Sequence, residues 1–90
     1  MRIVAVCGVG VGSSAILKLN AERALARLGL TADVSASDID SVGVSAADAQ
    51  VILTSPELVD RIGPTAADVV VIENYFDLDE VTRKVEDALS

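Results

Sequence analysis

Four short apolar runs alternate with segments of helical periodicity along this chain of 90 residues. The first run, Ile3 to Val6, contains no polar residue, which is typical of a strand that is buried on both faces of a parallel sheet. Strands that alternate with helices predict right-handed β-α-β crossovers, with helices on both faces of the sheet. We therefore expect an α/β fold with a four-stranded, doubly wound parallel sheet, and 2-1-3-4 is its simplest strand order.

The other runs give the expected order of elements. The second strand, residues 32–36, is more polar than the others and is therefore expected at an edge of the sheet. The expected strands are residues 3–6, 32–36, 50–54 and 68–72, and the expected helices are residues 14–28, 45–48, 56–62 and 78–89.

Residues that favour helix ends stand at several of these boundaries. Gly29 and Gly63 follow two of the expected helices, where a glycine commonly ends a helix. Ser55 stands before a proline and an acid, so we expect it to cap the helix that follows. Asp77 and Glu80 have the spacing of a capping box at the start of the last helix.

The charge and the cysteine count exclude several classes of function. A net charge of −7 argues against binding to nucleic acid or to an anionic membrane surface. One cysteine and no histidine can form neither an internal disulfide nor a zinc site, and no cofactor is expected. No apolar run approaches the roughly 20 residues of a membrane span, and no signal peptide is apparent. We expect residues 1–90 to form a single cytoplasmic domain.

A glycine-rich segment follows the first strand and is the expected functional site. Glycines alternate at positions 8, 10 and 12, so the main chain can bend closely around an anion and its N–H groups can converge on it. The helix that follows adds free N–H groups and the positive end of its dipole, so phosphate can bind without a basic side chain. The expected phosphate-binding residues are Gly8, Val9, Gly10, Val11, Gly12, Ser13 and Ser14.

Cys7 ends the first strand at the entrance of this segment. A lone cysteine is usually a small buried apolar residue, but the glycines, the hydroxyls and the helix beside it favour a reactive one. The N–H groups that hold a phosphate also stabilise a thiolate, which lowers the pKa of the thiol. We expect Cys7 to be a nucleophile that accepts a phosphoryl group, while these N–H groups hold the transferring oxygens.

Other glycine-loop chemistries fit less well. The segment contains no lysine, so it is not a Walker A nucleotide site. Gly10 to Ala15 loosely fits a G-x-G-x-x-A dinucleotide fingerprint with Asp38 as a ribose partner, but the chain lacks the second half that such domains normally carry. Lys18 lies one turn into the expected first helix. It either faces the phosphate or is solvated, and solvation is favoured.

Residues after the third and fourth strands lie at the same edge of the expected sheet. Thr54 and Ser55 could add hydroxyl donors there, although helix capping explains Ser55 better. Asn74 follows the fourth strand together with Tyr75 and Phe76, the only aromatic residues of the chain. This aromatic pair either contributes to a partner-binding surface or covers a core that is otherwise built from small aliphatic side chains.

Residues 2–14, from Arg2 through Cys7 to Ser14, resemble the opening of enzyme IIB subunits of the phosphoenolpyruvate-dependent sugar phosphotransferase system. The resemblance is closest to the ascorbate- and galactitol-type members of the lactose/cellobiose IIB superfamily. It implies a phosphotransferase in which Cys7 accepts a phosphoryl group from a phosphohistidine of the IIA component. Cys7 then passes the group to a sugar or sugar acid bound by the membrane-embedded IIC permease. Val9 and Val11 depart from the pattern, because ascorbate-type members often carry polar residues there.

The fold and loop also resemble those of low-molecular-weight protein tyrosine phosphatases, in a flavodoxin-like three-layer sandwich. Those enzymes use C-x5-R-[ST] and an Asp-Pro general acid, whereas this chain has Ser13 at the arginine position and no Asp-Pro dipeptide. Without the guanidinium clamp, hydrolysis is expected to be slow. A phosphatase-like hydrolase and a non-enzymatic module that binds an anion or a nucleotide are the alternatives.

Overall fold

A computed structural model of the chain describes residues 1–7, 11–45 and 47–89. Strands and helices alternate within these ranges, as the apolar runs predict. No helix in them is long and apolar enough to cross a membrane. The elements are β1 Arg2–Cys7, α1 Val11–Leu28, β2 Asp33–Asp38, α2 Val42–Ser45, β3 Val51–Thr54, α3 Val59–Ile62, β4 Asp68–Val71 and α4 Leu78–Leu89.

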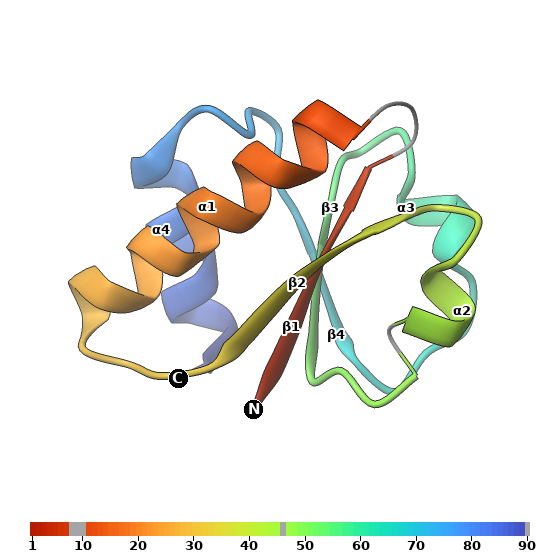
Figure 1. The fold of residues 1–90 in the computed structure, drawn as a ribbon, viewed down its shortest axis with the longest axis horizontal. Coiled ribbons are helices and arrows are strands. Elements are labelled where there is room, and N and C mark those ends of the chain that lie inside the picture. The colour runs from red at the N-terminus through yellow and green to blue at the C-terminus, as the bar shows by residue number, and fades with distance from the viewer. Residues whose placement is uncertain (8–10, 46, 90) are drawn as a thin grey trace.

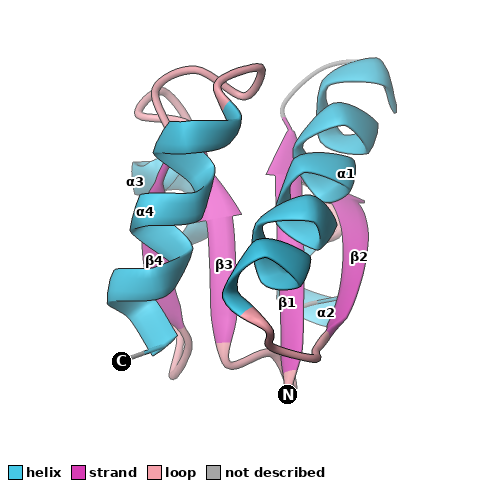
Figure 2. Cartoon of the chain, turned by 90° about the vertical axis from the view of Figure 1, so that its left-hand side faces the viewer, coloured by secondary structure: helices cyan, strands magenta, loops and turns pink. Residues whose placement is uncertain are grey.

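The four strands form one parallel sheet in the order β2-β1-β3-β4. Helices α1 and α4 cover one face of this sheet, and α2 and α3 cover the other (Figure 1). Seen from the side of the two long helices, α1 lies over β1 and β2, and α4 lies over β3 and β4 (Figure 2). The predicted strand order and the three-layer sandwich are confirmed, and β2 takes the predicted edge position.

The sheet separates two apolar cores, and the alternation of side chains along each strand divides its residues between them. Ile3 and Ala5 pack in the core beneath α1 and α4, whereas Val4 and Val6 pack in the core beneath α2 and α3. All four side chains are 0% exposed. The run that opens the sequence contains no polar residue because both faces of β1 are covered.

Glycines end two helices at the predicted positions. Gly29 has a φ of 70°, and its N–H donates to the Ala26 carbonyl at 3.2 Å. The next N–H, of Leu30, donates to the Leu25 carbonyl at 2.9 Å, which completes a Schellman motif at the end of α1. Gly63 follows α3 with a φ of 74°.

Helix α1 begins at Val11, earlier than the predicted start at Ser14. The prediction placed glycines 8, 10 and 12 in the loop, where they would let the main chain bend closely around an anion, and glycine also has a low helix propensity. That propensity costs only about 1 kcal/mol at one position, and packing of the long helix against the sheet outweighs it. Gly12 therefore lies in the first turn of the helix.

The predicted helix over residues 45–48 is wrong, because α2 occupies Val42–Ser45. Asp38 Oδ1 accepts the N–H of Ser41 at 2.8 Å and forms the turn that precedes this helix. Ile39 and Val42 are both buried in the core beneath α2. Burial of these two side chains, rather than the composition of small residues that follows, sets the position of the helix.

The predicted N-cap of the third helix, Ser55, is also wrong. Helix α3 begins at Val59, and the residue at its N-cap is Leu58, which makes no side-chain capping bond. Ser55 instead lies in the preceding turn, where its carbonyl accepts the N–H of Leu58 at 3.1 Å. Leu58 is buried in the same core as Val4 and Val6, so apolar burial positions this short helix.

Candidate functional site

The first strand and the first helix meet at the carboxyl edge of the sheet. β1 ends at Cys7, whose backbone pairs in register with Asp38 at the end of β2. Only residues 8–10 separate Cys7 from Val11, the first residue of α1. Figure 1 shows the end of β1, the start of α1 and the β4–α4 connection at the same end of the molecule, away from both chain termini. In sheets of this topology, ligands bind at this edge beside the central strands.

The predicted phosphate loop is divided between elements of the structure. Cys7 ends β1 as predicted, while residues 11–14 form the first turn of α1 instead of a loop. The main-chain N–H groups of a first helical turn have no acceptor within the helix, and they carry the positive end of its dipole. Residues 8–10 lie outside the described residues, and so does any contact between their N–H groups and the Cys7 sulfur.

Tyr75, in the connection between β4 and α4, reaches the end of β1. Its hydroxyl donates a hydrogen bond to the carbonyl oxygen of Val6, and the two oxygens are 2.9 Å apart. The ring packs against the core beneath α1 and α4. The sequence left open whether Tyr75 binds a partner or covers the core, and the structure shows that it covers the core.

Helix α1 holds the same connection from the other side. Asn20 Nδ2 donates to the carbonyl oxygen of Tyr75 at 2.7 Å, and the Asn20 side chain is 6% exposed. Sequence reasoning missed this residue. The available signal was a polar side chain on the apolar stripe of α1, between Leu17 and Ala21, where a buried amide needs a hydrogen-bond partner.

Glu80 holds the connection from α4. Its carboxylate accepts the N–H of Glu73 at 2.8 Å and that of Asn74 at 3.0 Å, and it pairs with Lys84 Nζ at 2.6 Å. Burial raises the pKa of Glu80, but the hydrogen bonds from Lys84 and from the two main-chain N–H groups, with the Lys84 charge, outweigh it and hold this pKa below its ordinary value. The carboxylate is therefore charged and fully engaged.

Only half of the predicted capping box forms at the start of α4. Asp77 Oδ1 accepts the N–H of Glu80 at 3.2 Å, which confirms Asp77 as the cap. The Glu80 carboxylate bonds to the chain before Asp77 and not to Asp77 itself. The spacing thus identified the helix start correctly, and the same glutamate has the additional task of fixing the β4–α4 connection.

Phe76 differs from its neighbour Tyr75. Its side chain is 72% exposed, while its main-chain N–H donates to Asn74 Oδ1 at 3.0 Å. An exposed aromatic side chain on a connection held by several hydrogen bonds is a common feature of protein-binding surfaces. The two aromatic residues thus have separate roles: Tyr75 packs inside and Phe76 faces outward.

The structure gives no support to the weaker candidates Thr54, Ser55 and Lys18 as site residues. The Thr54 side chain at the end of β3 is fully buried, and its hydroxyl has no hydrogen-bond partner among the described residues. Ser55 lies half-buried in the turn after β3. Lys18 forms a partly exposed pair with Glu22 at 3.3 Å, in agreement with a solvated role.

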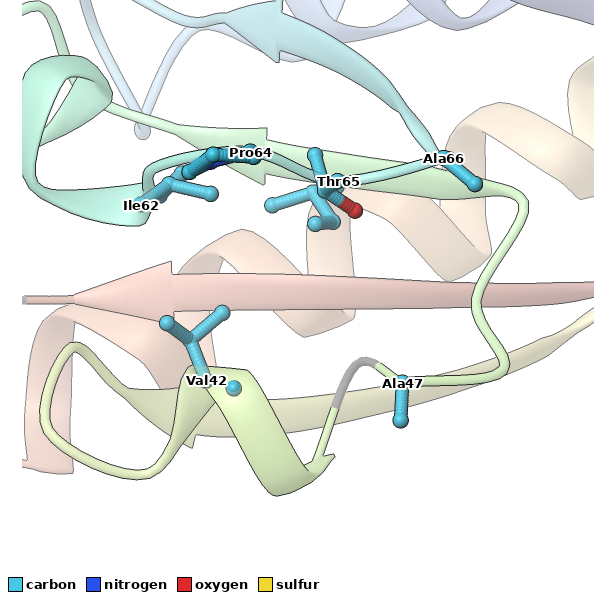
Figure 3. A pocket seen from close by; sticks show the side chains of 8 residues that line it. Val42, Ala47, Ile62, Pro64, Thr65 and Ala66 are labelled. Carbon is cyan, nitrogen blue, oxygen red and sulfur yellow. The ribbon is translucent and has the colours of Figure 1, made fainter.

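A pocket of about 180 Å³ opens on the side of α2 and α3 (Figure 3). Figure 3 shows Val42 and Ala47 on one side of it and Ile62, Pro64 and Thr65 on the other, with the Val42 side chain pointing across. No titratable side chain is among the residues that line it, so this pocket offers no group for acid–base or nucleophilic chemistry. Its lining consists of Val42, Gly43, Ala47, Ile52, Ile62, Pro64, Thr65 and Ala66.

Comparison with known proteins decides the family. The sequence profile of a family described as "PTS system, Lactose/Cellobiose specific IIB subunit" matches residues 2–87, which extend from β1 into α4. The chain belongs to this family. As a IIB subunit of the sugar phosphotransferase system it is a phosphotransferase, and membership implies that it works with IIA and IIC components. The resemblance seen in the first loop is thereby confirmed.

A relative with a curated description supports the assignment. The "Ascorbate-specific PTS system EIIB component" of Mycoplasma pneumoniae is 30% identical to this IIB subunit over 90 residues. The alignment covers 99% of this chain and 95% of the relative, so the two proteins correspond over nearly their whole lengths.

Proposed function

We propose that Cys7 of this IIB subunit is the residue that carries the phosphoryl group. In the first step the Cys7 thiolate forms an S–P bond while the N–P bond of a IIA phosphohistidine breaks. The histidine nitrogen keeps the electron pair of the broken bond. In the second step a hydroxyl of a sugar bound by the IIC permease forms an O–P bond and releases its proton to water. The S–P bond breaks, and the Cys7 thiolate leaves with the electron pair.

The observation that carries this proposal is the position of Cys7 in the fold. The only cysteine of the chain ends a central strand of the sheet, and residues 8–10 connect it to the amino end of an 18-residue helix. A helix amino end stabilises both a thiolate and a phosphoryl group. Gly8, Val9 and Gly10, with the N–H groups of residues 11–14, are the proposed phosphate-binding segment.

The composition of the segment favours a carrier over a hydrolase. A carrier has to keep its phosphocysteine away from water until the acceptor binds. Ser13 stands where the similar phosphatases place an arginine, and the chain contains no Asp-Pro dipeptide to protonate a leaving group. Both absences slow the attack of water on phosphorus.

We propose a sugar acid of the ascorbate type as the final acceptor, because the relative described above is ascorbate-specific. Residues 1–90 would act as one carrier unit, which is supported by a family match over residues 2–87 and by two cores that share one sheet. The cytoplasm is the proposed compartment, since it keeps a single nucleophilic thiol reduced.

Labelling with a phosphorylated IIA component tests the proposal. The intact mass of the parent should increase by one phosphate, and peptide mapping should place that phosphate on Cys7. Cys7→Ala should remain unlabelled, whereas Ser41→Ala, an exposed serine outside the segment, should be labelled like the parent. Labelling of Cys7→Ala at the parent rate would exclude the proposal.

A further inference from the structure

We propose that Tyr75 is a positioning residue for the Cys7 nucleophile. Its hydroxyl bonds to the carbonyl of Val6, and that carbonyl belongs to the peptide group that joins Val6 to Cys7. This inference rests on the proposed role of Cys7 and adds to it a residue from the other end of the chain. The separation between Tyr75 and Val6 in the sequence is 69 residues, so no local rule places them together.

The Val6–Cys7 peptide lies where support from the sheet diminishes. The register pairs of β1 with β3 run from Ile3–Val51 to Ala5–Leu53, so Val6 lies one residue beyond the last pair. On the other side, the pairs of β1 with β2 continue to Cys7–Asp38. At this end β1 is still paired with β2 but no longer with β3. The hydrogen bond from the Tyr75 hydroxyl holds the Val6 carbonyl there.

Tyr75 is itself held firmly enough to act as a support. Its carbonyl accepts a hydrogen bond from the buried amide of Asn20, and its ring packs in the core beneath α1 and α4. The residues before it are fixed by the Glu80 carboxylate, which accepts the N–H groups of Glu73 and Asn74. A phenol on such a support costs little conformational entropy to hold in place.

The chemical consequence concerns both the thiol and the transfer. The stabilisation of a thiolate by N–H groups and by a helix dipole falls off within the first helical turn, so it depends on where the sulfur lies. In-line phosphoryl transfer has a similar demand, because small misplacements of a nucleophile reduce rates strongly. A hydrogen bond that fixes the peptide group of Cys7 therefore affects both the stabilisation of the thiolate and the rate of phosphoryl transfer.

A purely structural role for Tyr75 is the competing explanation, and Tyr75→Phe separates the two. This variant keeps the ring in the core and removes only the hydroxyl. Thr82→Val is a control, because it removes another hydroxyl that donates to a main-chain carbonyl, that of Leu78 at 2.7 Å, within the first turns of α4 and without a bond to β1. Each variant loses one hydrogen bond from a hydroxyl to a main-chain carbonyl, between residues 69 apart in Tyr75→Phe and four apart in Thr82→Val, so both variants should stay folded.

The first readout is the pH dependence of Cys7 alkylation by iodoacetamide, measured on folded protein. The chain has one cysteine, so the rate reports on that thiol alone. Tyr75→Phe should raise the apparent pKa of the thiol by about half a unit. It should slow phosphoryl transfer from IIA by about tenfold, with the effect in the rate constant at saturating donor. Thr82→Val should match the parent in both.

Asn20→Asp gives a second route to the same conclusion. In this variant a carboxylate oxygen, instead of an N–H donor, faces the Tyr75 carbonyl. It should displace Tyr75 and raise the thiol pKa, as Tyr75→Phe does.

Parent-like alkylation and transfer in folded Tyr75→Phe would overturn the inference. Equal shifts in Thr82→Val would also overturn it, because they would indicate general loosening. If Cys7 of the parent takes up no phosphate, the proposed function fails instead, and the alkylation profiles still judge Tyr75.

Discussion

Lys84 Nζ lies 2.6 Å from Glu80 Oε2, one helical turn away on α4, and 2.7 Å from the carbonyl oxygen of Val71 at the end of β4. The pair therefore ties the last helix to the strand that precedes it. Because Glu80 also accepts two main-chain N–H groups of the β4–α4 connection, a single buried carboxylate organises the turn that carries Tyr75 and Phe76.

Removal of this charge should destabilise the protein in a pH-dependent manner. In the folded protein the pKa of Glu80 lies below its ordinary value of 4.5. A carboxyl group with a lowered pKa adds stability above its unfolded pKa, and this contribution is lost as the pH falls through the folded value. Glu80→Gln should therefore lower the free energy of unfolding by about 1–3 kcal/mol at pH 7. The difference from the parent should shrink below pH 4.5 in urea titrations.

Glu86→Gln is the matched control for that measurement, because Glu86 is exposed on the same helix. It should stay within about 0.5 kcal/mol of the parent at both pH values. A Glu80→Gln difference that is constant between pH 7 and pH 3 would contradict the electrostatic explanation and leave only a packing effect.

Gly29, which ends α1, and Gly43, which lies within α2, should respond in opposite ways to substitution by alanine. Gly29 has a φ of 70°, and a methyl group there would meet no atom within 4 Å, so the cost is backbone strain alone. Gly29→Ala should lose about 1–2 kcal/mol. Gly43 lies within α2 and is equally open, so Gly43→Ala should be neutral or gain up to about 1 kcal/mol. Thermal unfolding measures both, and a similar loss in the two variants would contradict the argument.

The sequence was sufficient for the features that depend on local pattern. The apolar run at Ile3–Val6 predicted a strand covered on both faces, and the alternation of runs predicted the strand order. Gly29 and Asp77 marked helix ends correctly, because caps are defined by chemistry within a few residues. The glycine segment after Cys7 was enough to identify the family.

The features that were missed depend on contacts between distant residues. Nothing near Tyr75 in the sequence indicates that its hydroxyl reaches Val6, or that Asn20 bonds to its carbonyl. The starts of α2 and α3 were misplaced because the burial of Val42 and Leu58 overrides the local signals of Ser55 and of the residues after Ser45. Glu80 was predicted to bond back to Asp77 in a capping box. Its carboxylate instead accepts the N–H groups of Glu73 and Asn74 in the β4–α4 connection.

Restoration of the missing arginine should convert part of the carrier activity into hydrolysis. Ser13→Arg places a guanidinium where the similar phosphatases have one, and a guanidinium can bind two phosphoryl oxygens and stabilise their charge. We expect the phosphorylated protein to lose phosphate to water about threefold to tenfold faster. A full phosphatase rate is not expected, since no Asp-Pro acid is present. Release of inorganic phosphate measures the rate, and Ser13→Ala should show no acceleration.

Truncation of Phe76 should weaken partner docking without changing the fold or the nucleophile. The side chain is 72% exposed, so Phe76→Ala should leave the free energy of unfolding within about 0.5 kcal/mol of the parent. Phe76 follows Tyr75, which contacts the end of β1, so a IIA component that reaches Cys7 would cover it. The apparent KM for phosphorylated IIA should rise about fivefold or more, as for an aromatic interface anchor, while the pH profile of Cys7 alkylation stays unchanged.

Leu30 provides the control, because it is 45% exposed and lies after α1 at the opposite edge of the sheet. Leu30→Ala should keep the parent KM. An equal rise in both variants would show that general surface hydrophobicity, and not the position of Phe76 in the β4–α4 connection, governs docking.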